Sequence, residues 1–456
     1  MSNNSFFDRL KSTLAHNRLA QAAHTFLVVL GMRKDKDLLR RIKPKQKIAP
    51  TWSQGDDLSE TTGWGDIDIT PEPFFYNRNR PMKIMYLNSM GGSMSRLARA
   101  LMMHEDVDAS CYINAFYPRR NMVHGLETNV NGVFTHDEWR DFMKWAVGEY
   151  DIIQTTTLPV WDGVAECYDW LSETIGRRHI WRSTGFVHNY LQHEDVLPLS
   201  VFQRDLHTEA VPNIGQYSGK TFPVKDNKFQ LGENVMFYSS PEKGVYFEGA
   251  HKHWLPSIRL PERFTPAEPK PVSEHDTVKI YVPAHSRAMF KGLEEVSRIL
   301  HNMQDGGANI DIITPDNVGE HLPDINGFKH ACKHGVSNGA YPIPNHHIAS
   351  VLRSVDIVVD QIVMGSYGNT GIEAMLCGKP VVGQKNYTEI KDSPIVSAHR
   401  ENFKTVIENL IEDRAQWAEL GAAGREWALA HHAPHVVAKI AADVYHETLE
   451  SSSTQV

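Results

Sequence analysis

Two basic residues in the second half of the chain have the types and spacing to hold a phosphate-bearing ligand. Arg287 and Lys291 stand four positions apart, just after the apolar run 278–282 and at the expected start of a helix. A diphosphate is held well by a forked guanidinium group and an ammonium group that converge on it. The alternative is two cations that face solvent, and the spacing by itself leaves that alternative open.

A glycine-rich stretch further along the chain could bind an anion through its backbone. Segment 365–371 contains three glycines and three hydroxyl residues, and it leads into an expected helix. Free N–H groups at a helix N-terminus attract anions, so we expect Gly368, Asn369 and Thr370 to contact the ligand. Glu373 would lie in the first helical turn, where a carboxylate can accept hydrogen bonds from a ribose. Its alternative role is to complement the helix dipole.

The first half of the chain contains a second turn of this kind. The apolar segment 83–87 predicts a short strand, Gly91 and Gly92 follow it, and a helix is expected from 94 to 103. Strand, glycine-rich turn and helix form the opening of many α/β nucleotide-binding domains. The turn is not GxGxxG, and many such turns bind nothing.

The wider pattern of the chain is an alternation of strands and helices. Further short segments at 151–154, 179–183, 310–313 and 356–360 predict strands, and the Pro-rich segment 256–271 predicts a connector between two units. Such alternation is typical of mainly parallel, doubly wound sheets. Ligands bind at the carboxyl ends of these strands and between domains, so the glycine turns and the basic pair are expected to line one cleft.

Composition excludes several classes of protein. The 456 residues are 41% hydrophobic and 22% charged, as in an ordinary globular protein. The longest apolar stretch, 25–32, is far shorter than the roughly 20 residues of a membrane-spanning helix. Four cysteines lie far apart without a CxxC pair, and no HExxH motif is present, so we expect no metal site and a reducing, cytoplasmic setting.

Charge is distributed unevenly along the chain. Residues 1–47 contain 11 Lys and Arg but three acidic residues, a net charge of +8, which leaves −16 on the remainder of a chain whose total is −8. A basic arm favours a polyanionic neighbour, an anionic membrane first and nucleic acid second. The alternative is a solvent-exposed helical tail whose charged residues serve only to keep it in water.

The segment "DIVVDQIVMGSYGNTGIEAMLCGKPVVG" at 356–383 resembles the signature of GT-B glycosyltransferases of the retaining family 4 type. Segments 254–266, 283–292 and 420–434 resemble other parts of that family, and the likeness extends over 83–445. It implies an α/β, GT-B fold: two Rossmann-like doubly wound domains that face a cleft, here with a basic α-helical N-terminal extension. The domain boundaries expected from it are 1–80 for the extension and linker, 81–262 for an acceptor domain, 275–430 for a nucleotide-sugar domain, and 431–450 for a helix that packs back on the first domain.

The resemblance also implies roles for individual residues. Arg287 and Lys291 would stabilise the leaving diphosphate of the donor, Glu373 would bind its ribose, and Gly91 with Gly92 would lie beside the cleft. The catalytic histidine of the family best matches His188, with His193 as the alternative. The family usually has another glutamate at the position of Gly365, and backbone groups from 366 to 370 would replace it.

The implied reaction moves a sugar from a nucleotide-diphosphate sugar to an acceptor hydroxyl, with retention and without a metal or other cofactor. A lipid-linked or surface glycan is the expected acceptor, and residues 1–47 would contact the inner face of a membrane. Three alternatives remain open: a sugar-nucleotide isomerase of the same fold, a DNA-modifying glycosyltransferase, and a non-catalytic sugar-nucleotide binder.

Overall fold

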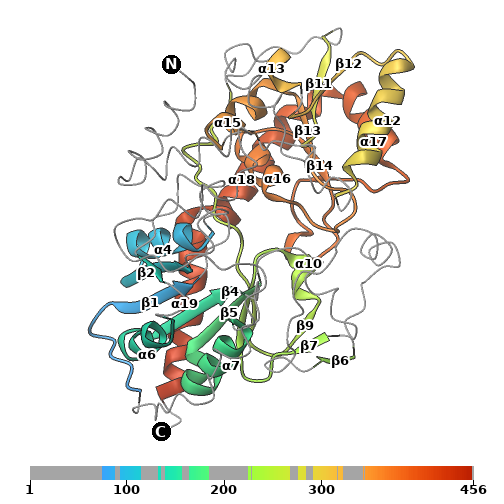
Figure 1. Cartoon of the computed structure of the whole chain (residues 1–456). Helices are drawn as coiled ribbons and strands as arrows, with labels where there is room; N and C mark the ends of the chain where they lie inside the picture. The colour runs from blue at the N-terminus through green and yellow to red at the C-terminus, as the bar shows by residue number, and fades with distance from the viewer. Residues whose placement is uncertain are drawn as a thin grey trace, which may run out of the picture.

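The structure is a computed structural model (Figure 1). It describes residues 74–87, 93–114, 132–134, 139–156, 164–183, 224–226, 228–267, 276–283, 291–315, 317–321, 343 and 345–453. The basic arm 1–47 therefore lies outside the described residues, as do Gly91, Gly92, His188 and Arg287.

The first α/β unit is built on a seven-stranded sheet in which all paired neighbours run parallel. Its order is β10-β8-β5-β4-β1-β2-β3, so the chain starts inside the sheet and winds outward in both directions. Parallel sheets are covered on both faces, which is why the sequences of β1 and β5 are buried almost throughout. The strands are β1 (Met82–Leu87), β2 (Val107–Asn114), β3 (Gly132–Phe134), β4 (Ile152–Thr156), β5 (His179–Ser183), β8 (Val235–Tyr238) and β10 (Lys252–Trp254).

Helices cover both faces of this sheet. Met85, Ile153 and Trp181 belong to the core on one face, with residues of α6 and α7. Ile84 and Ile180 belong to the core on the other face, with residues of α4 and the C-terminal helix. The helical elements of the unit are α4 (Ser93–His104), α6 (Trp139–Glu149), α7 (Val164–Ile175), the 3-10 turn η3 (Gly176–Arg178) and α10 (Pro241–Gly244).

A small sheet of order β6-β7-β9 extends the first unit. Phe229 and Phe247, whose ring centroids are 5.7 Å apart, join it to the core beneath α6 and α7. Its strands are β6 (Val224–Lys225), β7 (Lys228–Gln230) and β9 (Phe247–Glu248). The adjoining α10 lies at the end of the first unit nearest the second unit (Figure 1).

The second α/β unit has a five-stranded parallel sheet of order β12-β11-β13-β14-β15. Buried clusters on its two faces contain, among others, Ile372 and Trp427 on one side and Leu300 and Ile407 on the other. The strands are β11 (Val278–Tyr281), β12 (Ile310–Ile313), β13 (Ile357–Val359), β14 (Val381–Gly383) and β15 (Val396–Ser397). The helical elements are α12 (Leu293–Asp305), α13 (Val318–His321), α15 (Asn345–Ser354), α16 (Asn369–Leu376), η5 (Thr388–Ile390), α17 (Phe403–Glu412), η6 (Arg414–Gln416) and α18 (Trp417–His432).

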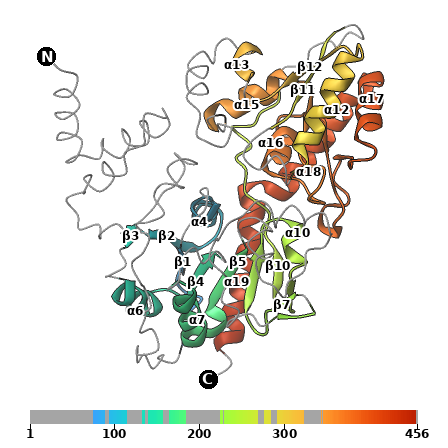
Figure 2. The same ribbon diagram turned by 45° about the vertical axis from the view of Figure 1, so that its right-hand side comes forward.

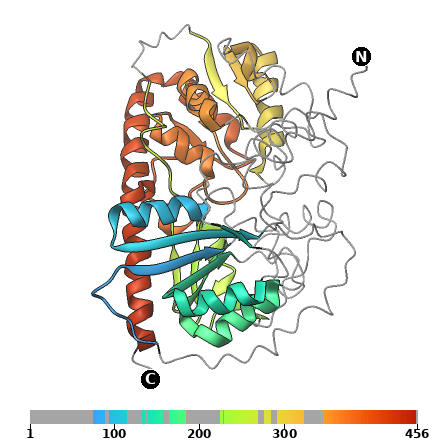
Figure 3. The same cartoon turned by 60° about the vertical axis from the view of Figure 1, so that its left-hand side comes forward.

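The end of the chain returns to the first unit. Helix α18 packs on α16 in the second unit, and α19 (Pro434–Ser453) packs on α4 in the first, so the two helices run along both units (Figures 2 and 3). The Tyr445 hydroxyl lies 2.9 Å from the Tyr86 hydroxyl of β1 and donates a hydrogen bond to Gln154 of β4. Helix α19 is therefore part of the first unit's core.

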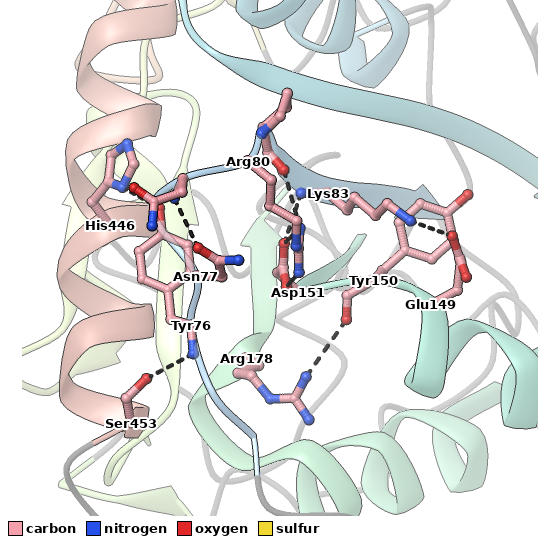
Figure 4. A network of polar contacts seen from close by, with 12 residues as sticks. Tyr76, Asn77, Arg80, Lys83, Glu149, Tyr150, Asp151, Arg178, His446 and Ser453 are labelled. Atoms are coloured by element: carbon pink, nitrogen blue, oxygen red, sulfur yellow. Dashed lines mark hydrogen bonds and ion pairs between the residues drawn. The ribbon is translucent and has the colours of Figure 1, made fainter.

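A polar network fastens the start of the described chain at the amino ends of β1 and β4 (Figure 4). Arg80 makes two hydrogen bonds, of 2.6 and 2.7 Å, to the buried carboxylate of Asp151. That carboxylate also accepts the backbone N–H of Lys83 at 2.8 Å. Tyr76 reaches His446 of α19 at 2.7 Å. Because ligands of parallel sheets bind at the opposite, carboxyl ends, we interpret this network as structural.

The sequence prediction of two mainly parallel α/β units is confirmed. The predicted strand 310–313 coincides with β12, and the predicted strand 83–87 corresponds to β1. In each sheet the strand order reverses at one point, between β1 and β4 and between β11 and β13. These are the positions at which open α/β sheets bind ligands. Among the described helices, none is long and apolar enough to cross a membrane.

Candidate functional site

The reversal point of the second sheet brings Lys291 and Asp360 together. Asp360 directly follows β13, and Lys291 precedes α12. The Lys291 Nζ and Asp360 Oδ1 atoms are 3.8 Å apart, with side-chain exposures of 11% and 0%. Burial raises the pKa of Asp360, and the ammonium group of Lys291 opposes that rise. Asp360 was not among the site residues predicted from the sequence, because it appeared there as the end of an apolar strand.

Asp360 explains two of the glycines at the start of α16. The backbone N–H of Gly368 donates a hydrogen bond to its carboxylate. A Cβ atom on Gly371 would lie 2.6 Å from Asp360 Oδ2, and one on Gly368 would lie 3.0 Å from both Asp360 Oδ1 and Lys291 Nζ. The glycines thus permit a buried carboxylate to approach the helix N-terminus. Asn369 is exposed and Thr370 partly so, and both stand beside this position.

Glu373 forms an ion pair across the boundary between the units. Its Oε1 atom is 3.0 Å from Nε of Arg259, which belongs to the connector after β10. Burial lowers the pKa of Arg259 to about 10 and raises that of Glu373. The backbone N–H of Arg259 donates to the carbonyl of His432, at the end of α18. Glu373 therefore stands at the junction of α16, the connector and α18.

The backbone at Gly365 strongly favours glycine. Its φ of +80° lies in the left-handed region, and a Cβ atom would lie 2.8 Å from the Tyr387 ring. A glutamate at this position would strain the backbone and would require the Tyr387 ring to shift. A carboxylate from the first unit lies nearby instead, because Glu242 of α10 accepts a hydrogen bond from the hydroxyl of Ser366. Nothing in the sequence connects Glu242 to this loop, since only the packing of the two units brings them together.

The predicted site residues fall into two groups. Lys291, Gly368 and Glu373 gather with Asn369 and Thr370 at the carboxyl end of the second sheet, close to the first unit. The other predicted residues, Gly91, Gly92, His188, its alternative His193 and Arg287, lie outside the described residues. Within the described part of the chain, no group of three or more His, Cys, Asp or Glu residues could hold a metal ion.

No protein-family model matches the chain, and no curated protein matches its sequence. Solved structures do match its fold. A glycosyltransferase from Rickettsia africae is 12% identical, with a TM-score of 0.52, over 81% of this chain and 99% of that one. HepE from Anabaena in complex with UDP is 14% identical, with a TM-score of 0.50, over 80% of this chain and all of that one.

A third structure has the same architecture. The α-glucosyltransferase AGT in complex with UDP is 11% identical, with a TM-score of 0.50, over 80% of this chain and all of the other. Identities this low establish the fold alone. Two parallel α/β units joined by a connector, with a C-terminal helix that returns to the first unit, form the GT-B fold of glycosyltransferases, and this chain has that fold.

Proposed function

We propose that the protein is a glycosyltransferase that moves a sugar from a nucleotide-diphosphate sugar to an acceptor hydroxyl with retention. The observation that carries the proposal is the grouping of Lys291, the N-terminus of α16 and Glu373 at the reversal point of the second sheet. A protein named as a glycosyltransferase and one named as an α-glucosyltransferase, the latter in complex with UDP, share the fold, as does HepE in complex with UDP. The resemblance of segment 356–383 to the family 4 signature supports the same reaction.

Each residue has a proposed role in that reaction. The bond between the anomeric carbon and the diphosphate oxygen breaks, the acceptor oxygen bonds to the same face of that carbon, and the acceptor proton moves to the diphosphate. Lys291 and Arg287 stabilise the charge that develops on the leaving diphosphate. Glu373 accepts hydrogen bonds from the ribose, while Asn369 and Thr370 offer backbone N–H groups to the donor. His188, Gly91 and Gly92 are proposed to face the sugar from the first unit.

The direct test is a panel of UDP-, GDP-, ADP- and CMP-sugars, in which binding and slow hydrolysis are measured with the full chain. We expect one nucleotide class to bind and to release its nucleoside diphosphate. UDP-sugars are our first choice, because two structures of the same fold are complexes with UDP. Binding without hydrolysis or transfer would favour the non-catalytic binder, which the missing glutamate at Gly365 also suggests. An epimeric sugar nucleotide without released diphosphate would favour the isomerase. Absence of binding to any of them would refute the proposal.

We further propose that the acceptor is a lipid-linked or surface glycan and that residues 1–47 hold the protein at an anionic membrane face. The net charge of +8 on this arm supports the proposal, because each Lys or Arg near an anionic surface contributes about 1 kcal/mol of attraction. The full chain should sediment with phosphatidylserine vesicles at low salt and less so at high salt. A variant that lacks residues 1–47 should not sediment. Binding to duplex DNA instead of vesicles would favour the DNA-modifying alternative.

A further inference from the structure

The segment between Asp360 and α16 connects the two sides of the proposed donor site. The backbone N–H of Ile362 donates a hydrogen bond of 2.9 Å to the carbonyl of Lys291. At the other end of the segment, the backbone N–H of Gly368 donates to the carboxylate of Asp360. The conformation of segment 361–368 therefore determines where Lys291 stands relative to the N-terminus of α16.

Hydrogen bonds within the second unit hold the backbone of this segment. The Nε2 atom of Gln361 donates to the carbonyl of Ser366 at 2.8 Å. Gln384, which follows β14, accepts a hydrogen bond from the N–H of Gly365, and the Gly365 carbonyl accepts one of 2.8 Å from the N–H of Asn386. The Nε2 atom of Gln361 also donates to the Ser366 hydroxyl oxygen at 3.4 Å. The hydrogen of that hydroxyl is thus left for an acceptor elsewhere.

The first unit supplies that acceptor. The Oε2 atom of Glu242, in α10, accepts the hydrogen bond from the Ser366 hydroxyl. Its Oε1 atom accepts one from the hydroxyl of Ser240, just before α10. Glu242 is 6% exposed and Ser366 is 0% exposed, so water does not compete for their contact. A hydrogen bond to a carboxylate is stronger than one between neutral groups, and a buried setting strengthens it further. Glu242 therefore ties the proposed donor segment to the first unit.

Two neighbouring contacts keep the two units together at this place. Met364, from the same segment, is 7% exposed and belongs to a buried cluster of the first unit that also contains Tyr246. The hydroxyl of Tyr238, at the end of β8, donates a hydrogen bond of 2.8 Å to Glu389 of η5. Because these contacts do not involve Glu242, loss of its carboxylate should release the Ser366 hydroxyl without separating the units.

We propose that Glu242 is a positioning residue for the donor site. Through Ser366, its carboxylate holds segment 361–368 in the conformation that presents Lys291 and the start of α16 to the nucleoside diphosphate. The affinity for the donor thus depends on a contact between the two units, although the donor itself lies on the second. This role rests on the proposed function, since it requires a donor at that place.

The test is calorimetry of the full chain with UDP, or with whichever nucleoside diphosphate of the panel binds. Glu242→Ala and Ser366→Ala should each weaken binding by about tenfold, the loss of one hydrogen bond to a charged group. The double variant should bind no more weakly than the weaker single variant, because both substitutions break the same contact. Glu242→Gln should stay within about twofold of wild type, because an amide can exchange hydrogen bonds with both serine hydroxyls.

Glu233→Ala is the matched control, since this side chain of the first unit is 80% exposed, and it should not change the affinity. Unchanged affinity in Glu242→Ala and Ser366→Ala would overturn the positioning role and leave the proposed function standing. Additive losses in the double variant would overturn it too, because the two residues would then act separately. Tighter binding in Glu242→Gln would show that the carboxylate acts on the diphosphate by repulsion, which also contradicts the role. If wild type binds no nucleoside diphosphate, the proposed function fails and the positioning role fails with it.

A stability measurement distinguishes positioning from support of the fold. The melting temperature of each variant is determined first, and calorimetry is done well below it, so that only folded protein is titrated. A lower melting temperature together with wild-type affinity would mean that the contact only supports the fold. If Glu242→Ala does not fold, Ser366→Ala decides the question alone, because it removes a single oxygen atom. A loss of about tenfold in that variant would support the role, and unchanged affinity would overturn it.

Discussion

Lys291 is the described cation best placed to meet a donor diphosphate. Its ammonium group stands 3.8 Å from Asp360, a distance that leaves its hydrogen-bond donors available to a second anion. Lys291→Ala should weaken binding of the nucleoside diphosphate by about 1.5–3 kcal/mol, the usual contribution of a hydrogen bond to a charged group. Calorimetry measures this change. Lys404→Ala, on the exposed surface of α17, is the control, and equal affinities for the two variants would remove Lys291 from the site.

Glu373 should affect both stability and nucleotide binding, because it pairs with the buried Arg259. Glu373→Gln leaves that guanidinium without its carboxylate and should lower the free energy of unfolding by on the order of 3 kcal/mol. The double variant Glu373→Gln/Arg259→Met removes the orphaned charge and should recover much of this loss. If Glu373 binds the ribose, the single and the double variant should both bind the nucleotide more weakly than wild type. Wild-type affinity in the double variant would confine Glu373 to a structural role.

At the scale of elements, the crossing of α18 with the turn after α16 admits no side chain. A Cβ atom on Gly421 would lie 2.1 Å from the carbonyl oxygen of Gly378. Gly421→Ala must push the two elements apart and should cost about 1–3 kcal/mol of unfolding free energy. Gly148→Ala in α6 is the matched control, since a Cβ there meets nothing within 4 Å. It should stabilise the protein by about 0.5–1 kcal/mol. Denaturant unfolding of the two variants checks the opposite signs.

For the whole molecule, two buried histidines predict a loss of stability in acid. Burial lowers the pKa of His179 and of His432 from 6.5 to about 3. His432 joins three segments, because its Nδ1–H donates to the Ser257 carbonyl at 2.9 Å and its Nε2 accepts from the Tyr367 hydroxyl at 2.9 Å. The unfolded chain therefore binds protons at these sites below pH 6.5, whereas the folded chain does so only near pH 3.

The contribution of each histidine to the free energy of unfolding is thus complete above pH 6.5, and it declines as the pH falls toward 3. The slope should be about 1.4 kcal/mol per pH unit for each histidine. Denaturant unfolding between pH 6.5 and 4 should show this slope. His432→Leu should reduce this slope by about 1.4 kcal/mol per pH unit, the contribution of one histidine. An unchanged slope in His432→Leu would mean that this ring takes up its proton at the same pH in the folded and in the unfolded chain.

The sequence by itself determined the class of the fold. Buried parallel strands must be nearly continuous apolar runs, and runs such as 278–282 and 310–313 can be recognised without any knowledge of their partners. The glycines at the start of α16 can also be recognised in the sequence, because a close contact with the backbone leaves no room for a side chain. Lys291 and Glu373 were also predicted from local spacing, and the structure brings both to one sheet end.

Only the tertiary structure decided what those residues contact. Asp360 looked like the last residue of a strand, and its role appears when the strand end meets the start of α16. The pairing of Glu373 with Arg259 depends on how the two units pack against one another. Local periodicity records which way a side chain points, but it contains no information about which distant charge it meets. Burial increases the energetic effect of these contacts, because an interior of low polarity strengthens a charge pair and makes an unpaired charge unfavourable.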